Sequence, residues 1–397
     1  METFFYILAF LQIVVGLYLI LQAIQWSSYV RRRLQTDAGF YTPKTAVLCP
    51  CRGMELDLEK NLKALCEFDY QNYELFFILA SATDAAYSTV KRVAEQAGAK
   101  AHIVIANKPQ GRSEKVNNLS VAISQLDPEF EMLVFADSDG RPGKGWLRKL
   151  IAPLSDSRIG ATTTMRWFMP NKIDFSTALL AAWNAPVLTM LTENGPNFCW
   201  GGGTAIRRGL FEQIGVMTDW ENSVSDDCSL TLALRRAGRS ILFLPECLTV
   251  SHVSADFGSV LEFTNRQILI TRVYLPKMWI TAFAAHFLYC FTLLLGIVVT
   301  MQEMIATRPA LHLATLVFVP LLLSAIRSAI RLAGVTEALP AWRQQIMGLA
   351  WIYIALPIFA PFLYLINFLN SIVTRKIRWR GAIYELVSSG QTRIISY

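Results

Sequence analysis

Charged residues are scarce in this sequence. Asp, Glu, Lys and Arg make up 17% of its 397 residues, whereas about 25% is usual in a soluble domain. The shortfall lies in roughly residues 1–25 and in everything after about residue 281, while residues 43–276 have an ordinary composition. We therefore exclude an intrinsically disordered protein, a small disulfide scaffold and a freely soluble enzyme.

A regular cysteine pattern is also missing. The seven cysteines are an odd number, and only Cys49 and Cys51 lie close together, as C-x-C. No zinc-binding spacing fits them, so we interpret them as free buried thiols in a reducing compartment. The sequence begins Met1-Glu2-Thr3 and so lacks the positive start of a cleaved signal peptide.

Long apolar runs are present instead. Residues 4–26, 281–301, 311–330 and 346–373 are each long enough to cross a bilayer, which takes about 20 residues. The last run is broken by Pro357 and Pro361. Before the second run, residues 261–280 mix basic and apolar side chains, which is typical of a helix that lies in the membrane interface. The sequence thus predicts a soluble domain held at a membrane from both ends.

Basic clusters flank the apolar runs and account for much of the formal charge of +7. Arg31, Arg32 and Arg33 follow the first run, and residues 375–380 follow the last. Such clusters indicate cytoplasmic orientation and anionic headgroups, so no nucleic-acid partner is expected. We expect a multi-pass integral membrane protein, in the inner membrane if bacterial, with its N-terminus outside and the soluble domain cytoplasmic. The basic segment 374–397 would then be cytoplasmic only if residues 346–373 are shallow or re-entrant, which we favour.

The middle of the chain alternates between strand and helix patterns. Short apolar runs at residues 45–50, 74–79, 102–105 and 132–136 read as buried strands, and residues 57–68, 85–97 and 116–125 between them have helical spacing. This predicts an α/β fold with a mostly parallel sheet and helices on both faces, over residues 43–260. Ligands of such sheets bind at the carboxyl ends of the strands.

Two acidic motifs occupy such positions. Asp137-Ser138-Asp139 directly follows a predicted strand, where two carboxylates suit Mg²⁺ or Mn²⁺ bridging a diphosphate; an ordinary polar turn is the alternative. Asp226-Asp227 precedes a predicted helix. A helix cap needs only one acid, so we expect one of this pair to be a general base.

Two further loops could contact a ligand. Gly201, Gly202 and Gly203, followed by Thr204, would permit close approach of the backbone, although a structural turn remains possible. The loop that begins at Gly111 contains Arg112 and Lys115, which could neutralise phosphates or simply be solvated.

Taken in order, the motifs resemble those of the family-2-type GT-A glycosyltransferases. Within these, the sequence is most similar to the membrane-bound ceramide glucosyltransferase family and its bacterial relatives, including hopanoid-linked sugar transferases. The resemblance runs from about residue 45 to residue 279 and includes the flanking spans. The motifs that carry it are Pro50-x-Arg52-Gly53, Asn61-Leu62, Phe68-Asp69-Tyr70, Lys115-Val116-Asn117-Asn118-Leu119, Asp137-Ser138-Asp139, Gly202-Gly203-Thr204 and Asp226-Asp227.

The resemblance implies an inverting transfer of a sugar, glucose being expected, from a UDP-sugar to the hydroxyl of a membrane lipid such as ceramide. Asp137 and Asp139 would hold a divalent cation, Mn²⁺ or Mg²⁺, and Asp227 would deprotonate the acceptor. Donor-binding residues would be Pro50, Arg52, Gly53, Asp84, Lys115, Asn118 and Asp137, and acceptor-binding residues Gly202, Gly203, Thr204, Arg266, Gln267 and Arg272.

The sequence departs from the family pattern in two places. Family members usually have an acidic residue directly after the second strand. Here the first acidic residue after that strand is Asp84, several positions further along the chain. The family's (Q/R)-x-x-R-W motif has no tryptophan here, which leaves Arg266 and Arg272 for the arginine role. In some GT-A enzymes a histidine near His252 completes the metal site, so His252 is a third candidate ligand, although a lone histidine is more often structural.

Other functions fit less well. Transfer of N-acetylglucosamine to a hopanoid or of glucose to diacylglycerol stays open, because the sequence fixes neither sugar nor lipid. A processive polysaccharide synthase would need more helices than four candidate spans supply, and snorkelling at a membrane edge explains Arg327 and Arg331. A glycoside hydrolase needs no D-x-D, and a non-catalytic sugar-nucleotide scaffold should have lost part of its acid set, which is intact.

Overall fold

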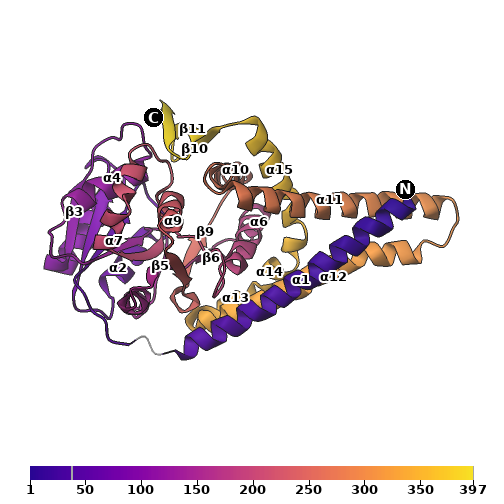
Figure 1. Ribbon diagram of the computed structural model, residues 1–397, viewed down its shortest axis with the longest axis horizontal. Helices are drawn as coiled ribbons and strands as arrows, with labels where there is room; N and C mark the ends of the chain where they lie inside the picture. The colour runs from indigo at the N-terminus through magenta and orange to yellow at the C-terminus, as the bar shows by residue number, and fades with distance from the viewer. Residues whose placement is uncertain (37–38, 397) are drawn as a thin grey trace. The chain divides into compact units, whose positions relative to one another are not determined.

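The computed structural model describes residues 1–36 and 39–396 (Figure 1). These divide into two compact units. The helical unit comprises Met1–Arg31, Ile173–Thr189 and Ala255–Thr374, and the α/β unit comprises Arg32–Lys172, Met190–Ser254 and Arg375–Tyr397. The units differ from the five segments expected from sequence, because residues 173–189 group with the apolar helices and the basic C-terminal segment groups with the α/β unit.

A seven-stranded sheet forms the centre of the α/β unit, in the order β3-β2-β1-β4-β7-β5-β8. Neighbouring strands run parallel except β7, which is antiparallel to both β4 and β5. The predicted mostly parallel sheet is thus confirmed. The strands are β1 (Thr45–Pro50), β2 (Tyr73–Leu79), β3 (Ala101–Ile105), β4 (Met132–Ala136), β5 (Ile159–Thr163), β7 (Gly203–Arg207) and β8 (Ser240–Phe243).

Helices cover both faces of this sheet because its central strands are apolar on both sides. In β1, Val47 and Cys49 pack under α2, α3 and α5, while Ala46 and Leu48 pack under α4, α7, α8 and α9. The helices are α2 (Leu58–Cys66), α3 (Tyr87–Ala97), α4 (Glu114–Ser124), α5 (Trp146–Ile151), α7 (Arg208–Gln213), α8 (Val216–Trp220) and α9 (Asp226–Arg236), with 3-10 turns at Gly98–Lys100, Ala152–Ser155 and Pro245–Cys247.

Two small sheets complete the α/β unit. β6 (Arg166–Pro170) pairs in parallel with β9 (Thr249–Val253). Residues 376–396, for which the sequence analysis gave no fold, form an antiparallel sheet of β10 (Lys376–Trp379), β11 (Ala382–Ser388) and β12 (Gln391–Ser396). Arg380 and Gly381 both have positive φ, 49° and 85°, as a two-residue turn between β10 and β11 requires.

Three helices of the helical unit are long and apolar enough to cross a membrane: α1 (Glu2–Gln35), α11 (Pro276–Ile305) and α12 (Leu311–Ala338). A fourth span exists only if residues Ala350–Ile358 and Ala360–Val373, which meet at a 57° bend, count as one. The remaining helices are α6 (Phe175–Asn184), α10 (Phe257–Tyr274), α13 (Arg343–Gly348), α14 (Ala350–Ile354) and α15 (Ala360–Val373), with 3-10 turns at Ala185–Met190, Pro340–Trp342 and Leu356–Ile358 (η6).

Two boundaries differ from expectation. The segment predicted as one interfacial helix over residues 261–280 breaks at Leu275, because Pro276 begins α11 as its first residue. α12 continues past residue 330 to Ala338. Along this extension α1 packs closely on α12, since a Cβ on Gly334 would lie 2.6 Å from the ring of Trp26 (Figure 1).

Candidate active site

The acidic motifs of the α/β unit gather at one edge of its central sheet. β1 and β4 end at Pro50 and Ala136, so the loops that follow them leave the sheet side by side. β7 runs the other way, and its first residue, Gly203, pairs with Ala136. The glycine turn that precedes β7 therefore lies beside Asp137, at the edge where α/β sheets bind ligands.

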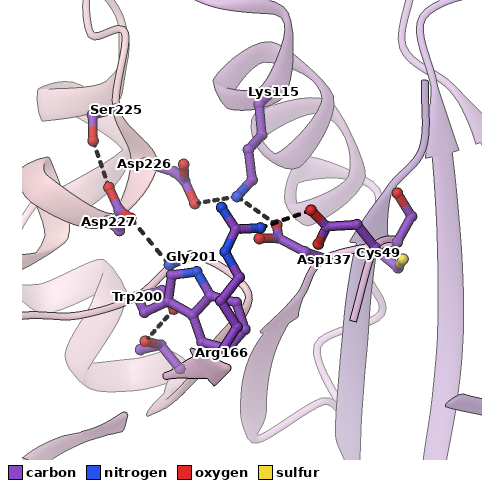
Figure 2. Close-up of polar contacts among 12 residues, drawn as sticks. Cys49, Lys115, Asp137, Arg166, Trp200, Gly201, Ser225, Asp226 and Asp227 are labelled. Atoms are coloured by element: carbon purple, nitrogen blue, oxygen red, sulfur yellow. Dashed lines mark hydrogen bonds and ion pairs between the residues drawn. The ribbon is translucent and has the colours of Figure 1, made fainter. Parts of the chain in front are cut away.

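Lys115 joins the two acidic motifs. Its Nζ lies 2.8 Å from Oδ1 of Asp137 and 3.3 Å from Oδ2 of Asp226 (Figure 2). Lys115 stands in the first turn of α4, which Ser113 caps by accepting a hydrogen bond from the amide of Val116. The start of α4 thus places the ammonium group of Lys115 between the carboxylates of Asp137 and Asp226, which come from two distant parts of the chain.

The charges in this cluster shift one another's pKa values. Burial alone lowers the pKa of Lys115, but the charges of Asp137 and Asp226 outweigh burial and raise it above its ordinary value. Burial, aided by the neighbouring charges of Asp227 and Asp137 and opposed by Lys115, raises the pKa of Asp226 to about 7. Lys115 therefore stays charged, and Asp226 binds a proton more readily than a carboxyl group usually does.

Asp227 is placed differently from its neighbour Asp226. It is half-buried, and its Oδ1 accepts hydrogen bonds from the hydroxyl of Ser225 at 2.5 Å and the amide of Cys228 at 2.7 Å. Its Oδ2 accepts one from the amide of Gly201 at 3.1 Å (Figure 2). The helix start is capped by Ser225, so neither aspartate side chain is needed as the N-cap.

Arg166 was missed by the sequence analysis. This residue begins β6, and its Nη1 lies 2.7 Å from Oδ2 of Asp139. Its guanidinium stands 4.7 Å from the ring centroid of Phe168 and 5.8 Å from that of Trp200. Burial raises the pKa of Asp139 while Arg166 opposes the shift. No local sequence motif predicts a site role for Arg166, because its position depends on the pairing of β6 with β9, which is distant in the sequence.

The residues of the D-x-D motif fit a divalent cation. Oδ1 of Asp139 is buried without a hydrogen-bond partner, and the carboxylates of Asp137, Asp139, Asp226 and Asp227 outnumber the cations Lys115 and Arg166. Hard carboxylate oxygens with spare acceptor capacity are what Mg²⁺ and Mn²⁺ bind. Within the described ranges, however, no three His, Cys, Asp or Glu side chains gather closely enough to form a ready metal site.

His252 is accordingly not gathered with the D-x-D motif. Its Nδ1 lies 3.7 Å from Oδ2 of Asp57, which also accepts a hydrogen bond from Nη2 of Arg141 at 2.9 Å. Burial, together with the charge of Arg141, lowers the pKa of His252. The histidine thus belongs to a polar group behind the D-x-D loop, and its role as a metal ligand stays a prediction.

The glycine turn is packed against the acid cluster. A Cβ on Gly201 would lie 2.3 Å from Oδ2 of Asp226, and one on Gly202 would lie 2.5 Å from Oδ2 of Asp137. Side chains at these positions would displace the carboxylates, so the turn needs glycine here. Thr204 is fully buried and its hydroxyl donates to the carbonyl of Trp200 at 2.8 Å, so its side chain holds the turn instead of facing an acceptor.

The loop after β1 is linked to the other predicted donor residues. Arg52 pairs with Glu114 at 2.8 Å, and the amide of Gly53 donates to Oδ1 of Asp84 at 2.8 Å. Asn118, one turn along α4 from Lys115, has a buried side-chain oxygen without a hydrogen-bond partner. Asp84 is thus tied to the loop after Pro50 despite its late position in the sequence.

The C-terminal sheet reaches the same loop. Arg380, in the turn between β10 and β11, pairs with Glu55 and donates to the carbonyl of Arg52. Glu55 also accepts a hydrogen bond at 2.9 Å from Ser138, the middle residue of the D-x-D motif. The contacts of Ser138 with Glu55 and of Glu55 with Arg380 therefore support the D-x-D loop from residues far away in the sequence.

The predicted acceptor residues of the (Q/R)-x-x-R-W region lie in the helical unit. Arg266, Gln267 and Arg272 are all on α10. Arg272 donates to the carbonyl of Ser371 and stands 5.9 Å from the ring centroid of Trp279. Arg272 therefore does have a tryptophan beside it, Trp279. Because Trp279 lies beyond the helix break at Leu275, it does not stand next to the arginine in the sequence as the linear motif requires.

Known proteins resemble this chain in sequence family and in fold. The model of "Glycosyl transferase family 21" matches residues 5–392. Among solved structures, the mannosyltransferase PcManGT from Pyrobaculum calidifontis, in complex with GDP-Man and Mn²⁺, is similar at a TM-score of 0.50 and 18% identity, over 93% of this chain and 98% of that one. GalNAc-T7 with UDP, GalNAc and Mn²⁺ matches at a TM-score of 0.42 and 10% identity, over 59% of this chain and 49% of that one, which is too weak to argue from. The PcManGT match shows the fold.

Proposed function

Because the chain belongs to glycosyl transferase family 21 and is a glycosyltransferase, we propose that it transfers a sugar from a UDP-sugar to the hydroxyl of a membrane lipid. Glucose and ceramide are the expected sugar and acceptor. The observation that carries the proposal is the cluster of Asp137, Lys115 and Asp226 at the carboxyl ends of the parallel strands. The long apolar helices support a lipid acceptor, because they would hold this site at a membrane surface.

The donor end of the site would bind the nucleoside diphosphate. Asp137 and Asp139 would hold the divalent cation, which when bound supplies charge to stabilise the leaving diphosphate. The unpartnered Oδ1 of Asp139 supports this assignment. Arg52, Gly53 and Asp84 would orient the nucleotide from the loop after β1. A divalent cation is in keeping with the PcManGT structure, which is a complex with GDP-Man and Mn²⁺.

Asp227 would be the general base. In one displacement the acceptor oxygen attacks the anomeric carbon, its proton passes to the Asp227 carboxylate, and the bond to the diphosphate breaks, its electrons leaving with the nucleoside diphosphate. The configuration at the anomeric carbon inverts. The half-buried position of Asp227 supports this role, because Asp226 is buried and already paired with Lys115.

Purified protein in lipid nanodiscs, supplied with UDP-sugars and a divalent cation, tests the proposal. UDP-glucose with ceramide should yield a glycolipid by mass spectrometry, and Asp227→Asn should yield none. Product with a hopanoid and UDP-N-acetylglucosamine, or with diacylglycerol, would replace the expected substrates. A polymer as the only product would refute lipid transfer, and donor binding without any product would favour a scaffold.

The position of the C-terminal sheet supports one membrane topology. Residues 375–396 belong to the α/β unit, so we expect them on the same side of the membrane as the strands before residue 254. An even number of crossings must therefore separate these two stretches. α11 and α12 supply two, and a third by α14–α15 would send the sheet to the wrong side. We infer that the bent segment is re-entrant, with the α/β unit and the basic cluster both cytoplasmic.

Cysteine labelling on intact cells tests this topology. In a variant without the seven native cysteines, Gly390→Cys places a thiol in the exposed turn between β11 and β12, and Ala306→Cys places one after α11. An impermeant maleimide should label position 306 directly and position 390 only after permeabilisation. Labelling of position 390 on intact cells would make the bent segment a full span.

A further inference from the structure

Two arginines lie inside the helical unit, on one face of α12. The side chain of Arg331 is 0% exposed, and it makes one hydrogen bond, from Nη2 to the hydroxyl of Ser328 at 3.1 Å. Its Nε and Nη1 are buried without a partner, and so is Nε of Arg327, one turn earlier. The sequence alone suggests snorkelling for both residues, but snorkelling does not describe Arg331, whose side chain is fully enclosed.

No carboxylate in the described parts of the chain pairs with either arginine. The ion pairs of this unit are made by other residues, Arg31 with Glu337 and Arg308 with Glu303. The hydroxyls of Tyr289 and Tyr364 donate to the carbonyls of Ile358 and Trp183. An arginine side chain does not lose its proton in proteins. The fully buried charge of Arg331 and the partly buried charge of Arg327 therefore lack a counter-ion among the described residues. Such burial is strongly unfavourable unless an anion joins them.

The depth of the pair along α12 indicates which anion is available. Glu337, paired with Arg31 at the start of the basic cluster, marks the membrane edge of this helix. At about 1.5 Å per residue, Arg331 lies about 9 Å further in. The polar layer on each side of the hydrocarbon core is about 5–8 Å thick. Arg331 therefore lies just inside the hydrocarbon, next to the layer of lipid phosphates, and Arg327 lies one turn deeper.

The helical backbone next to α12 is interrupted. α12 packs against α14 and η6, where the bent segment interrupts its helix. The carbonyl of Ile358 at this break accepts the hydroxyl proton of Tyr289. Irregular backbone at membrane depth is tolerated where it is buried in protein or lines a polar cavity.

We propose that Arg327 and Arg331 bind the phosphate of a membrane phospholipid, whose headgroup enters the helical unit beside the break between α14 and α15. A guanidinium fork matches phosphate oxygens in two-point geometry, and the phosphate supplies the missing negative charge. The hydroxyl of a neutral acceptor lipid supplies none. The site is therefore a phospholipid site separate from the sugar acceptor, and it does not rest on the proposed function.

The test uses the full-length protein in a neutral detergent and measures thermal unfolding and native mass spectra with added lipid. Phosphatidylglycerol and phosphatidylcholine should raise the unfolding temperature by about 2–5 °C and remain bound in the mass spectrum. Diacylglycerol, which lacks the phosphate, and inorganic phosphate, which lacks the chains, should do neither. Equal stabilisation by diacylglycerol, or none by any phospholipid, would overturn the proposal.

Substitutions separate a ligand site from a structural role. Arg331→Leu removes an enclosed charge, so without lipid the variant should unfold at the same or a higher temperature than the wild type, yet lose the shift caused by phospholipid. Arg331→Lys should keep part of that shift, and Arg308→Leu, an exposed control in the same unit, should keep all of it. An Arg331→Leu protein that unfolds earlier but keeps the full phospholipid shift would assign the arginine to packing alone.

Discussion

The two units bury charge in opposite ways. In the α/β unit, Lys115 is matched by Asp137 and Asp226, and Arg166 by Asp139, so the folded chain supplies counter-ions of both signs. In the helical unit, Arg331 is fully buried and Arg327 partly buried, and no carboxylate pairs with either in the described residues. The first arrangement is complete enough to fold without a ligand and has carboxylate to spare for a cation. The second depends on an anion from outside the chain.

Of the changes predicted here, removing the carboxylate of Asp139 should lower activity most. Asp139→Asn keeps the shape but halves the negative charge of the D-x-D motif, so transfer should fall about 10³-fold, because the diphosphate would leave without its charge partner. A chelator should abolish activity reversibly. Asp156→Asn, a carboxylate on the surface of the same unit that pairs with Arg158, is the matched control and should be active. Full activity in excess chelator would remove the metal from the mechanism.

The two members of the acid pair should respond differently. Asp227→Asn removes basicity and preserves shape, so turnover should fall about 10²-fold or more while UDP-sugar still binds by calorimetry. Asp226→Asn keeps the size of the buried group but weakens its ion pair with Lys115, so it should impair donor affinity as well as turnover. If Asp226→Asn alone is inactive and Asp227→Asn turns over normally, the two roles must be exchanged.

The smallest effect on activity is expected where Arg380 of the C-terminal sheet contacts Glu55. Arg380→Gln and Glu55→Gln each break the contact that supports Ser138, so each should raise KM for the donor about tenfold and leave kcat nearly unchanged. Because both act through one contact, the double variant should be no worse than either single one. Arg378→Gln, an exposed residue of β10 in the same hairpin, is the control. Additive losses in the double variant would show that the two residues act independently.

Much of the α/β unit could be predicted from sequence because its first strands are continuous apolar runs. β1 and β4 lie at the predicted residues, and the D-x-D and the acid pair lie at the strand and helix ends where the pattern put them. The family resemblance drawn from these motifs is confirmed by the match over residues 5–392. Local signals suffice here because each motif directly follows or precedes a regular element.

Residues that act through distant partners could not be predicted in this way. Arg166 contacts Asp139 only because β6 pairs with β9, and Arg272 meets Trp279 only across a helix break. The C-terminal sheet is a different case. Ile377 and Trp379, then Ala382, Tyr384 and Leu386, alternate around Arg380-Gly381, which is a hairpin pattern that the basic composition of the segment obscured.

The return of residues 375–396 to the α/β unit has a consequence for how the protein is made. The ribosome synthesises α1 and then the central sheet, next the apolar helices α11 and α12, and only afterwards the turn that carries Arg380. While α11 and α12 are still entering the bilayer, the α/β domain therefore lacks the ion pair of Arg380 with Glu55. If the contact of Arg380 with Glu55 supports donor binding in the way predicted above, full donor affinity would be reached only after insertion has ended and the final hairpin has docked.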